Sequence, residues 1–395
     1  MKSIIKNFNR EVKSLLLTNF LLSLGSSLFS LLYNLYLKDL GFTEGKIGII
    51  IAISIFSSSA FLSLSYFVNL NLVTLLKFLP LLFSLGIILQ GVLLPSLTLI
   101  IPGAIIMGLS IGILTFTYPP LLARKTDRAL RPYAFSFNFS LSLLSGIIGN
   151  LGGGFFKKLL ENFFDSKISY NITFLTGAIT VLFSITFLKC IKSEEAIEKA
   201  INEEKEKKNT KVGFLILIPQ ILIGLGAGLF VPYMNLYFKN LFKLDSDKIG
   251  LIFSTTSFVM FISALLAPFL TKIMKKIRVL ILTQGLSIPF MVVLALSDKI
   301  LISTISHIIR TSLMNMAQPL LSNVSMESVS MQYQKILNAS ITLSWNLSFA
   351  LSSLLGGYLI QTKGFTLSIL ISTILYTIST ILYCFLSKKE PFKNI

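Results

Sequence analysis

Asn34-Leu35-Tyr36-Leu37-Lys38-Asp39-Leu40 returns as Asn235-Leu236-Tyr237-Phe238-Lys239-Asn240-Leu241 in the second half of a 395-residue chain. Two shorter matches flank the copies: Leu24-Gly25 with Leu225-Gly226, and Lys46-Ile47-Gly48 with Lys248-Ile249-Gly250. The chain therefore contains one unit twice, and both copies are strongly apolar. A duplicated membrane bundle of this kind is typical of a transporter, whose repeats enclose the path of the solute.

The composition places most of the protein surface in lipid. Hydrophobic residues make up 53% of the chain and charged residues 13%, whereas soluble domains carry about 25% charged residues. The apolar residues form long blocks that a soluble core has no room to bury. This pattern excludes a soluble enzyme built around a single core.

Twelve apolar blocks are long enough to cross a bilayer as helices. We predict these spans at residues 14–37, 46–69, 73–94, 97–122, 134–156, 170–191, 212–238, 248–270, 278–297, 300–322, 336–360 and 365–386. The predicted fold is an all-α integral membrane protein with twelve transmembrane helices in two six-helix bundles, over residues 1–191 and 212–395. Six spans in each copy give both copies the same direction, so a pseudo-two-fold axis along the membrane normal should relate them.

The positive charge of the chain is a topology signal. The net charge is +18, and most Lys and Arg residues fall in loops on the same side as the two termini. By the positive-inside rule both termini lie in the cytoplasm, and we expect a multi-pass monomer in the cell inner membrane. Charge distributed in this way favours anionic lipid as a partner and argues against nucleic acid.

The composition of the chain changes sharply at residues 192–211, where charged residues replace the apolar blocks. Acid-first pairs four residues apart, such as Glu195 and Lys199, favour a surface helix. We interpret this stretch as a solvated cytoplasmic linker between the bundles; a regulatory or partner-binding segment is the alternative. The two cysteines, Cys190 and Cys384, predict neither a disulfide nor a metal site, and no cofactor is expected.

The repeat extends through the remaining spans. Pro120-Leu121-Leu122 matches Pro319-Leu320-Leu321, and Leu151-Gly152-Gly153 matches Leu355-Gly356-Gly357. Six spans on each side of a charged middle loop resemble the major facilitator superfamily, and the resemblance covers essentially the whole chain. It implies secondary or facilitated transport by alternating access, with a central site between the two bundles.

Remnants of a superfamily loop motif, Gly-x-x-x-Asp-Arg-x-Gly-Arg-Arg, support the resemblance. Between spans 8 and 9 the chain keeps its basic positions as Lys272, Lys275 and Lys276 but has neither the Asp nor the Gly. Between spans 2 and 3, Asn69 occupies the Asp position and no basic residue follows. The resemblance implies that these four residues latch the halves in the outward-facing state. The alternative is that the lysines only obey the positive-inside rule.

Span 5 carries a glycine-rich pattern that is similar to the exporter signature of the same superfamily. Gly146, Gly149, Gly152 and Gly153 are present, and Asn150 replaces the proline of the signature. Close packing between membrane helices is the alternative explanation, because small residues permit it in any bundle.

No acidic residue lies within a predicted span, since all 17 Asp and Glu residues fall in loops or tails. Ionisable groups in the bilayer are costly, and those present usually have a function. Proton-coupled and carboxylate-dependent sodium-coupled carriers need a carboxyl group there. Uniport or exchange is therefore favoured.

Span 10 places Arg310 near the middle of the membrane, one turn after His307, the only histidine of the chain. With no acid in any span, the guanidinium must meet carbonyls, hydroxyls, water or a ligand anion. We expect Arg310 to bind a carboxylate or phosphate of the solute, with His307 and Met314 in the same site. The alternatives are that Arg310 ties span 10 to neighbouring carbonyls or stabilises the break near Pro319, and that His307 is a proton-linked switch or a packing residue.

Four further residues are assigned to the substrate site. Asn34 in span 1 and Asn235 in span 7 correspond by the repeat, and Trp345 and Asn346 lie in the middle of span 11. A Trp away from the interfacial belts indicates a cavity wall or a helix contact. For the two asparagines, hydrogen bonds between helices are the alternative.

Transport of a small organic anion, or of an amphiphile with an anionic group, explains these features best. A multidrug-type exporter of hydrophobic compounds is the alternative, which the glycine-rich span 5 and the 33 Phe residues permit. An embedded enzyme would need an acid pair, a histidine cluster or an activated nucleophile within the spans. We therefore predict no enzymatic activity. A sensor without transport would normally carry a soluble domain.

Overall fold

The computed structural model describes residues 8–65, 68, 70–93, 95–127, 130–191, 210–316, 318–390 and 392–393. Asn69 and residues 192–209 of the predicted linker lie outside this set, so the latch role of Asn69 and the linker helix stay predictions. Over the described residues the chain is helical, with no β-strand.

In the described part of the first copy of the repeat there are seven helices. They are α2 (Arg10–Asp39), α3 (Glu44–Ser65), α4 (Leu72–Gly91), α5 (Leu97–Lys125), α6 (Arg131–Leu160), α7 (Ser166–Phe183) and the short α8 (Ile185–Leu188). The second copy forms α9 (Thr210–Phe214), α10 (Leu217–Phe230), the 3-10 turn η2 (Val231–Tyr233), α11 (Met234–Phe242), α12 (Ser246–Ile273), α13 (Lys276–Leu296), α14 (Ile300–Met316), α15 (Gln318–Glu327) and α16 (Met331–Leu386).

Within the described residues, ten helical stretches are long and apolar enough to cross a membrane. One of them, Ile336–Leu386, contains two predicted spans, because the chain turns at Gly364, where a φ of 80° requires a residue without a side chain. Predicted span 10 is divided into α14 and α15. With these two assignments the helices account for all twelve predicted spans.

The chain forms two compact units. The first comprises Met1–Phe42, Ile53–Ile197 and Phe238–Ser257, and the second comprises Thr43–Ala52, Glu198–Tyr237 and Phe258–Ile395. The units follow the two copies of the repeat except at residues 43–52 and 238–257, each of which belongs to the unit of the other copy. These two segments contain the repeated Lys46-Ile47-Gly48 and Lys248-Ile249-Gly250.

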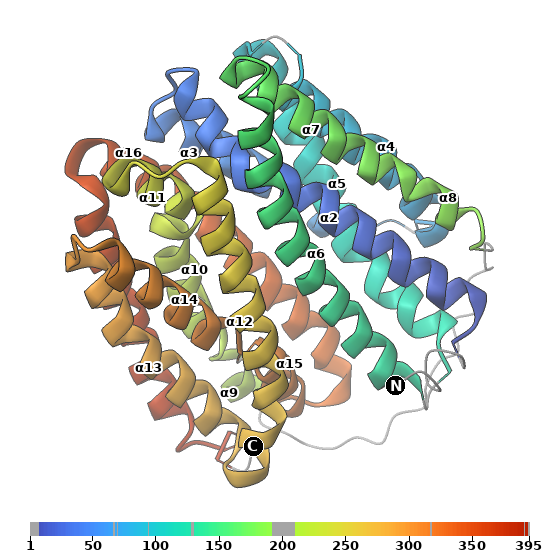
Figure 1. The fold of residues 1–395 in the computed structure, drawn as a ribbon. Coiled ribbons are helices and arrows are strands. Elements are labelled where there is room, and N and C mark those ends of the chain that lie inside the picture. The colour runs from blue at the N-terminus through green and yellow to red at the C-terminus, as the bar shows by residue number, and fades with distance from the viewer. Residues whose placement is uncertain are drawn as a thin grey trace. The chain divides into compact units, whose positions relative to one another are not determined.

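In the first unit α2 packs along α6 and α7, and α4 packs against α5 and α7 (Figure 1). Most of its core is aliphatic, but a polar network joins three helices within it. The amide of Asn19 donates to Asn138 and to Ser142 at 2.8 Å, and the hydroxyl of Tyr118 donates to Asn138 at 2.7 Å. Such bonds satisfy polar groups that lipid cannot solvate.

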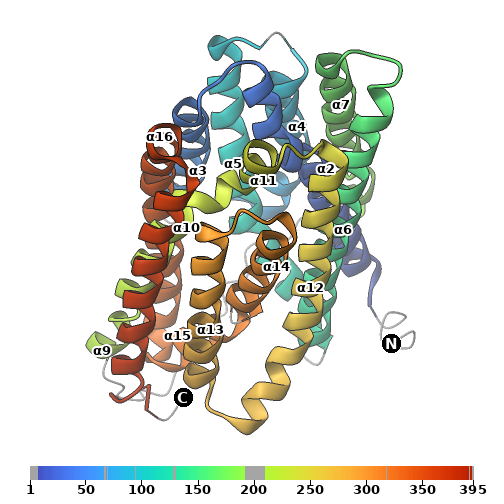
Figure 2. The ribbon, with the colours of Figure 1, turned by 60° about the vertical axis from the view of Figure 1, so that its left-hand side comes forward.

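In the second unit α10 lies along α16, and α13 packs against α14 and α16 (Figure 2). Glycines allow the closest approaches. A Cβ on Gly224 would lie 2.9 Å from the carbonyl oxygen of Trp345, and a Cβ on Gly226 would lie 2.8 Å from the ring of Tyr376. This close packing brings side chains of α10 and α16 together around α14.

Candidate functional site

Arg310 is buried between three helices of the second unit. Its side chain, on α14, is only 3% exposed. One terminal nitrogen donates a hydrogen bond of 2.9 Å to the hydroxyl of Tyr376 on α16. The guanidinium carbon lies 4.7 Å from the ring centroid of Phe230 on α10 and 5.4 Å from that of Tyr376. Two aromatic rings therefore enclose the cation, an arrangement that stabilises it through cation–π attraction.

The positive charge of Arg310 is not neutralised within the described part of the chain. No carboxylate there lies within ion-pair distance of it, and its Nε has no hydrogen-bond acceptor. A tyrosine hydroxyl and two rings compensate a buried cation only in part, because removing an ion from water costs several kcal/mol. The guanidinium thus keeps unused donors and an unneutralised charge, the two properties that bind an oxyanion.

His307 and Met314 share α14 with Arg310. His307 lies one turn before it and is 4% exposed. Met314 lies one turn after it, so it is about 6 Å further along the helix. The structure brings these three predicted residues together on one stretch of α14.

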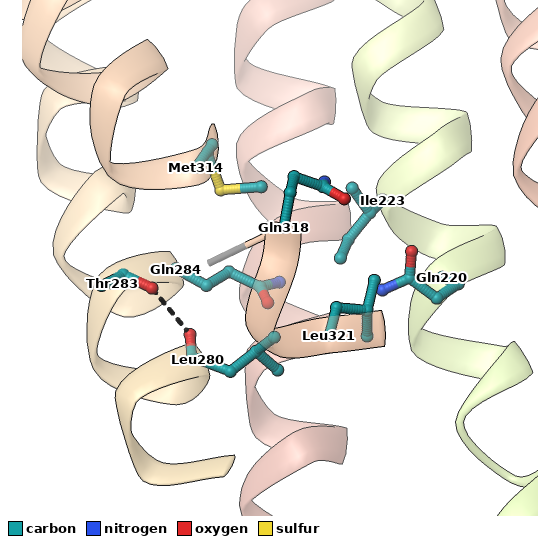
Figure 3. Close-up of a pocket in the computed structure, with 8 residues that line it drawn as sticks. All are labelled: Gln220, Ile223, Leu280, Thr283, Gln284, Met314, Gln318 and Leu321. Atoms are coloured by element: carbon teal, nitrogen blue, oxygen red, sulfur yellow. Dashed lines mark hydrogen bonds between the residues drawn. The ribbon is translucent and has the colours of Figure 1, made fainter. Parts of the chain in front are cut away.

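Met314 also lines a pocket inside the second unit. The empty space of this pocket, including the part open to solvent, is about 280 Å³. Its lining comes from α10, α13, α14 and α15, and consists of Gln220, Ile223, Leu280, Thr283, Gln284, Met314, Gln318 and Leu321 (Figure 3).

Trp345, another predicted substrate residue, packs against its own helix and α10. The ring of Trp345 stacks on Phe349 at 4.8 Å, and its backbone packs on α10 at Gly224, six residues before Phe230 and hence about 9 Å from it along the helix. The role of the Trp345 side chain in the substrate site stays a prediction. Asn346, beside Trp345, is half-buried.

The two asparagines that correspond by the repeat fall in different units. Asn34 is buried in the first unit and Asn235 in the second. The side-chain oxygen of Asn235 accepts the N–H of Leu236 at 2.9 Å, near the start of α11. Their assignment to the substrate site stays a prediction.

The three predicted latch lysines contact residues of their own unit. Lys276 pairs with Glu327, which ends α15, and Lys275 donates to the backbone oxygen of Lys393. Lys272 lies 5.5 Å from the ring of Phe269 on its own helix. The Lys276–Glu327 pair joins the start of α13 to the end of α15, and the latch role remains untested.

Sequence reasoning missed Phe230 and Tyr376, the two residues that hold Arg310. Both are aromatic residues in apolar spans, and their residue types alone do not mark them. A hint was available in Tyr376, since a tyrosine at the centre of a span needs a polar partner for its hydroxyl. Its partner lies 66 residues away, so only the fold identifies it.

Tyr376→Phe is expected to destabilise the second unit by removing the hydrogen bond of Arg310. Leaving a buried charged donor unpaired costs about 1–3 kcal/mol, so the melting temperature in detergent should fall by several degrees. Tyr358→Phe is the matched control, because Tyr358 lies on the same helix and is exposed. Equal melting temperatures for the two variants would contradict the structural importance of this bond.

Comparisons with known proteins agree with this architecture. The family model of the Major Facilitator Superfamily matches residues 15–335 and 216–394. No curated protein sequence matches the chain. Among solved structures, a D-xylose–proton symporter is similar with a TM-score of 0.75 at 12% identity, over 95% of this chain and 96% of that one.

Two further solved structures show the same likeness. A bacterial homologue of the human lysosomal transporter Spinster, inward-facing and unoccupied, has a TM-score of 0.70 at 10% identity, over 96% of each chain. The human organic anion transporter MFSD10 has a TM-score of 0.63 at 12% identity, over 95% of this chain and 99% of that one. At such identities the likeness shows the fold, and it confirms the predicted all-α, twelve-helix, two-bundle architecture.

Proposed function

Because the chain belongs to the Major Facilitator Superfamily, we propose that this transporter carries a small organic anion, or an amphiphile with an anionic group, and that Arg310 binds the anion. The observation that carries the proposal is the buried guanidinium, which has aromatic rings and one hydroxyl around it. A solute carboxylate or phosphate supplies the missing negative charge, and it can accept two N–H bonds at once from the planar fork.

The mode of transport that we propose for this site is uniport or exchange. Coupling to protons usually relies on a carboxyl group that titrates within the membrane, and no Asp or Glu lies within the predicted spans. The charge distribution of the loops supports both termini on the cytoplasmic side of the cell membrane. Of the structural neighbours, the human organic anion transporter carries the solute class that we propose here.

The pocket favours a second candidate function. All eight of its lining residues are uncharged, and four of them are aliphatic or Met. A pocket of this kind suits neutral or hydrophobic compounds, so export of such compounds is the alternative to anion transport.

A thermal-shift screen of paired ligands on the purified protein tests the proposal. Each carboxylate is compared with its neutral amide, on the wild-type protein and on Arg310→Ala. We expect carboxylates to raise the melting temperature of the wild type more than their amides do, and this difference to disappear in Arg310→Ala. A ligand that binds only the folded state raises its stability in proportion to the logarithm of its concentration over Kd.

Arg310→Lys serves as the control for folding in this screen. It keeps the charge but loses the planar fork, so anion stabilisation should be reduced and not abolished. Equal stabilisation of the wild type and Arg310→Ala by carboxylates would refute the role of Arg310. Stabilisation of all three proteins by neutral hydrophobic compounds alone would favour the exporter.

A further inference from the structure

The pocket and the Arg310 site are neighbours in the second unit. Met314 lines the pocket one turn after Arg310 on the same helix. Gln284, which also lines it, donates through Nε2 to the backbone oxygen of Tyr376 at 3.5 Å, and Tyr376 is the residue whose hydroxyl holds Arg310. A solute with its anionic group at Arg310 therefore has this pocket beside it.

The amide of Gln284 has a defined orientation. Ser379 donates its single hydroxyl hydrogen to the backbone oxygen of Pro219 at 3.1 Å. It can therefore only accept in its 3.0 Å bond with Gln284, so the nitrogen of that amide must face Ser379. The Oε1 of Gln284 is left as an acceptor, and no donor among the described residues bonds to it.

Thr283, on the adjoining turn, is also an acceptor toward the pocket. Its hydroxyl lies 3.0 Å from the backbone oxygen of Val279 and 3.2 Å from that of Leu280, and it donates its hydrogen to them. Figure 3 shows the bond to Leu280. In the same way, the amide of Gln220 donates to the hydroxyl of Tyr383. Figure 3 shows the side chains of Gln220 and Gln284 extending toward each other from opposite helices.

On the polar side of the pocket, Gln220 and Gln318 contribute amides that can donate as well as accept. Gln284 and Thr283 present acceptor oxygens, because the N–H groups of Gln284 and the hydroxyl hydrogen of Thr283 are already donated. Oxygen acceptors without a charge pair with hydroxyl or N–H groups and give no gain with a second carboxylate. The other side is apolar and is formed by Ile223, Leu280, Met314 and Leu321. The volume of about 280 Å³ includes space open to solvent, so the enclosed part of the pocket is smaller and suits a compact group such as a single hydroxyl or N–H.

We propose that this pocket binds the uncharged, hydrogen-bond-donating part of the transported anion. The substrate class is then a hydroxylated or N–H-bearing organic anion: its carboxylate or phosphate lies at Arg310, and its hydroxyl or N–H groups donate to Gln284 and Thr283. This assignment rests on the proposed function. It adds a preference for solutes whose uncharged part is polar over solutes that carry an alkyl chain. Arg310 alone does not provide this preference.

Binding of D-gluconate and hexanoate to the purified full-length protein tests the assignment, because both are six-carbon carboxylates and only gluconate carries hydroxyls. We expect gluconate to bind at least fivefold more tightly. Gln284→Leu should weaken gluconate binding about fivefold and leave hexanoate unchanged, since each lost hydrogen bond costs up to about tenfold in affinity. Thr283→Val should act in the same direction.

Gln361→Leu is the matched control, since Gln361 lies on α16 of the same unit outside the pocket and contacts Gly45. It should leave both affinities unchanged. The assignment is overturned if the wild type does not prefer gluconate to hexanoate, or if Gln284→Leu weakens both ligands equally. The proposed function fails separately if Arg310→Ala binds gluconate as tightly as the wild type does, whatever the effect of Gln284→Leu.

Discussion

Gly250→Val is expected to abolish transport and to lower the melting temperature by several degrees. Gly250 lies on α12, in the segment that joins the first compact unit, and faces Gly154 on α6. A Cβ at position 250 would lie 2.5 Å from the backbone oxygen of Asn150 and 3.2 Å from the Cα of Gly154. Both are backbone atoms, so the two helices must move apart. Overpacking of this kind costs about 1–3 kcal/mol or more.

Gly152→Val is the matched control for this prediction. Gly152 belongs to the same glycine-rich stretch of α6, but a Cβ there would meet nothing within 4 Å. Both substitutions introduce the same β-branched residue into a membrane helix, so their difference isolates the contact between α6 and α12. Melting temperature and uptake of a ligand from the screen are the measurements, and equal effects of the two substitutions would contradict the proposed contact.

A similar contact occurs in the second unit, where Gly48 corresponds to Gly250 by the repeat. A Cβ on Gly48 would lie 2.7 Å from the backbone oxygen of Ser353 and 3.5 Å from the Cα of Gly357. The sequence already identified Gly48 and Gly250 as repeated, and offered close packing as one explanation of the glycines in span 5. It did not predict their partners, because two helices far apart in the chain must first be placed side by side.

The candidate site was predictable to a similar extent. Arg310 stood out in the sequence because no acid was available to pair with it, and its neighbours His307 and Met314 follow from helix periodicity. The rest of the site depends on contacts between α14, α10, α13 and α16. The periodicity of the apolar spans does not encode these contacts. Gln284 illustrates the limit: its importance comes from the orientation that Ser379 imposes on its amide.

Charge reversal at Asp39 is expected to open one end of the first unit. Asp39 ends α2, where it pairs with Lys239 of α11 and accepts a 2.9 Å hydrogen bond from the hydroxyl of Tyr170. Asp39→Lys replaces these attractions by the repulsion of two ammonium groups. Both side chains of the pair are partly exposed, at 37% and 26%, so solvent screening limits the effect to about 1–2 kcal/mol, or roughly tenfold in an equilibrium.

Labelling of a buried cysteine measures this opening directly. In a background with Cys190→Ser and Cys384→Ser, Leu37→Cys introduces a thiol at a fully buried position of α2. Its reaction with maleimide should be about tenfold faster in Asp39→Lys, and Lys239→Asp in the same chain should restore the slow rate by re-forming the pair in reverse.

Lys363→Asp is the control for a change of net charge, since Lys363 is exposed beside the turn between the last two spans. It should leave the labelling rate unaltered. A double variant that labels as fast as Asp39→Lys would show that the pair does not hold this end closed.

Asp39 and Lys239 occupy equivalent stretches of the repeated Asn-Leu-Tyr segment, where the second copy has Asn240 in place of the acid. Because the second copy lacks this acid, the ion pair takes its carboxylate from the first copy and its ammonium group from the second.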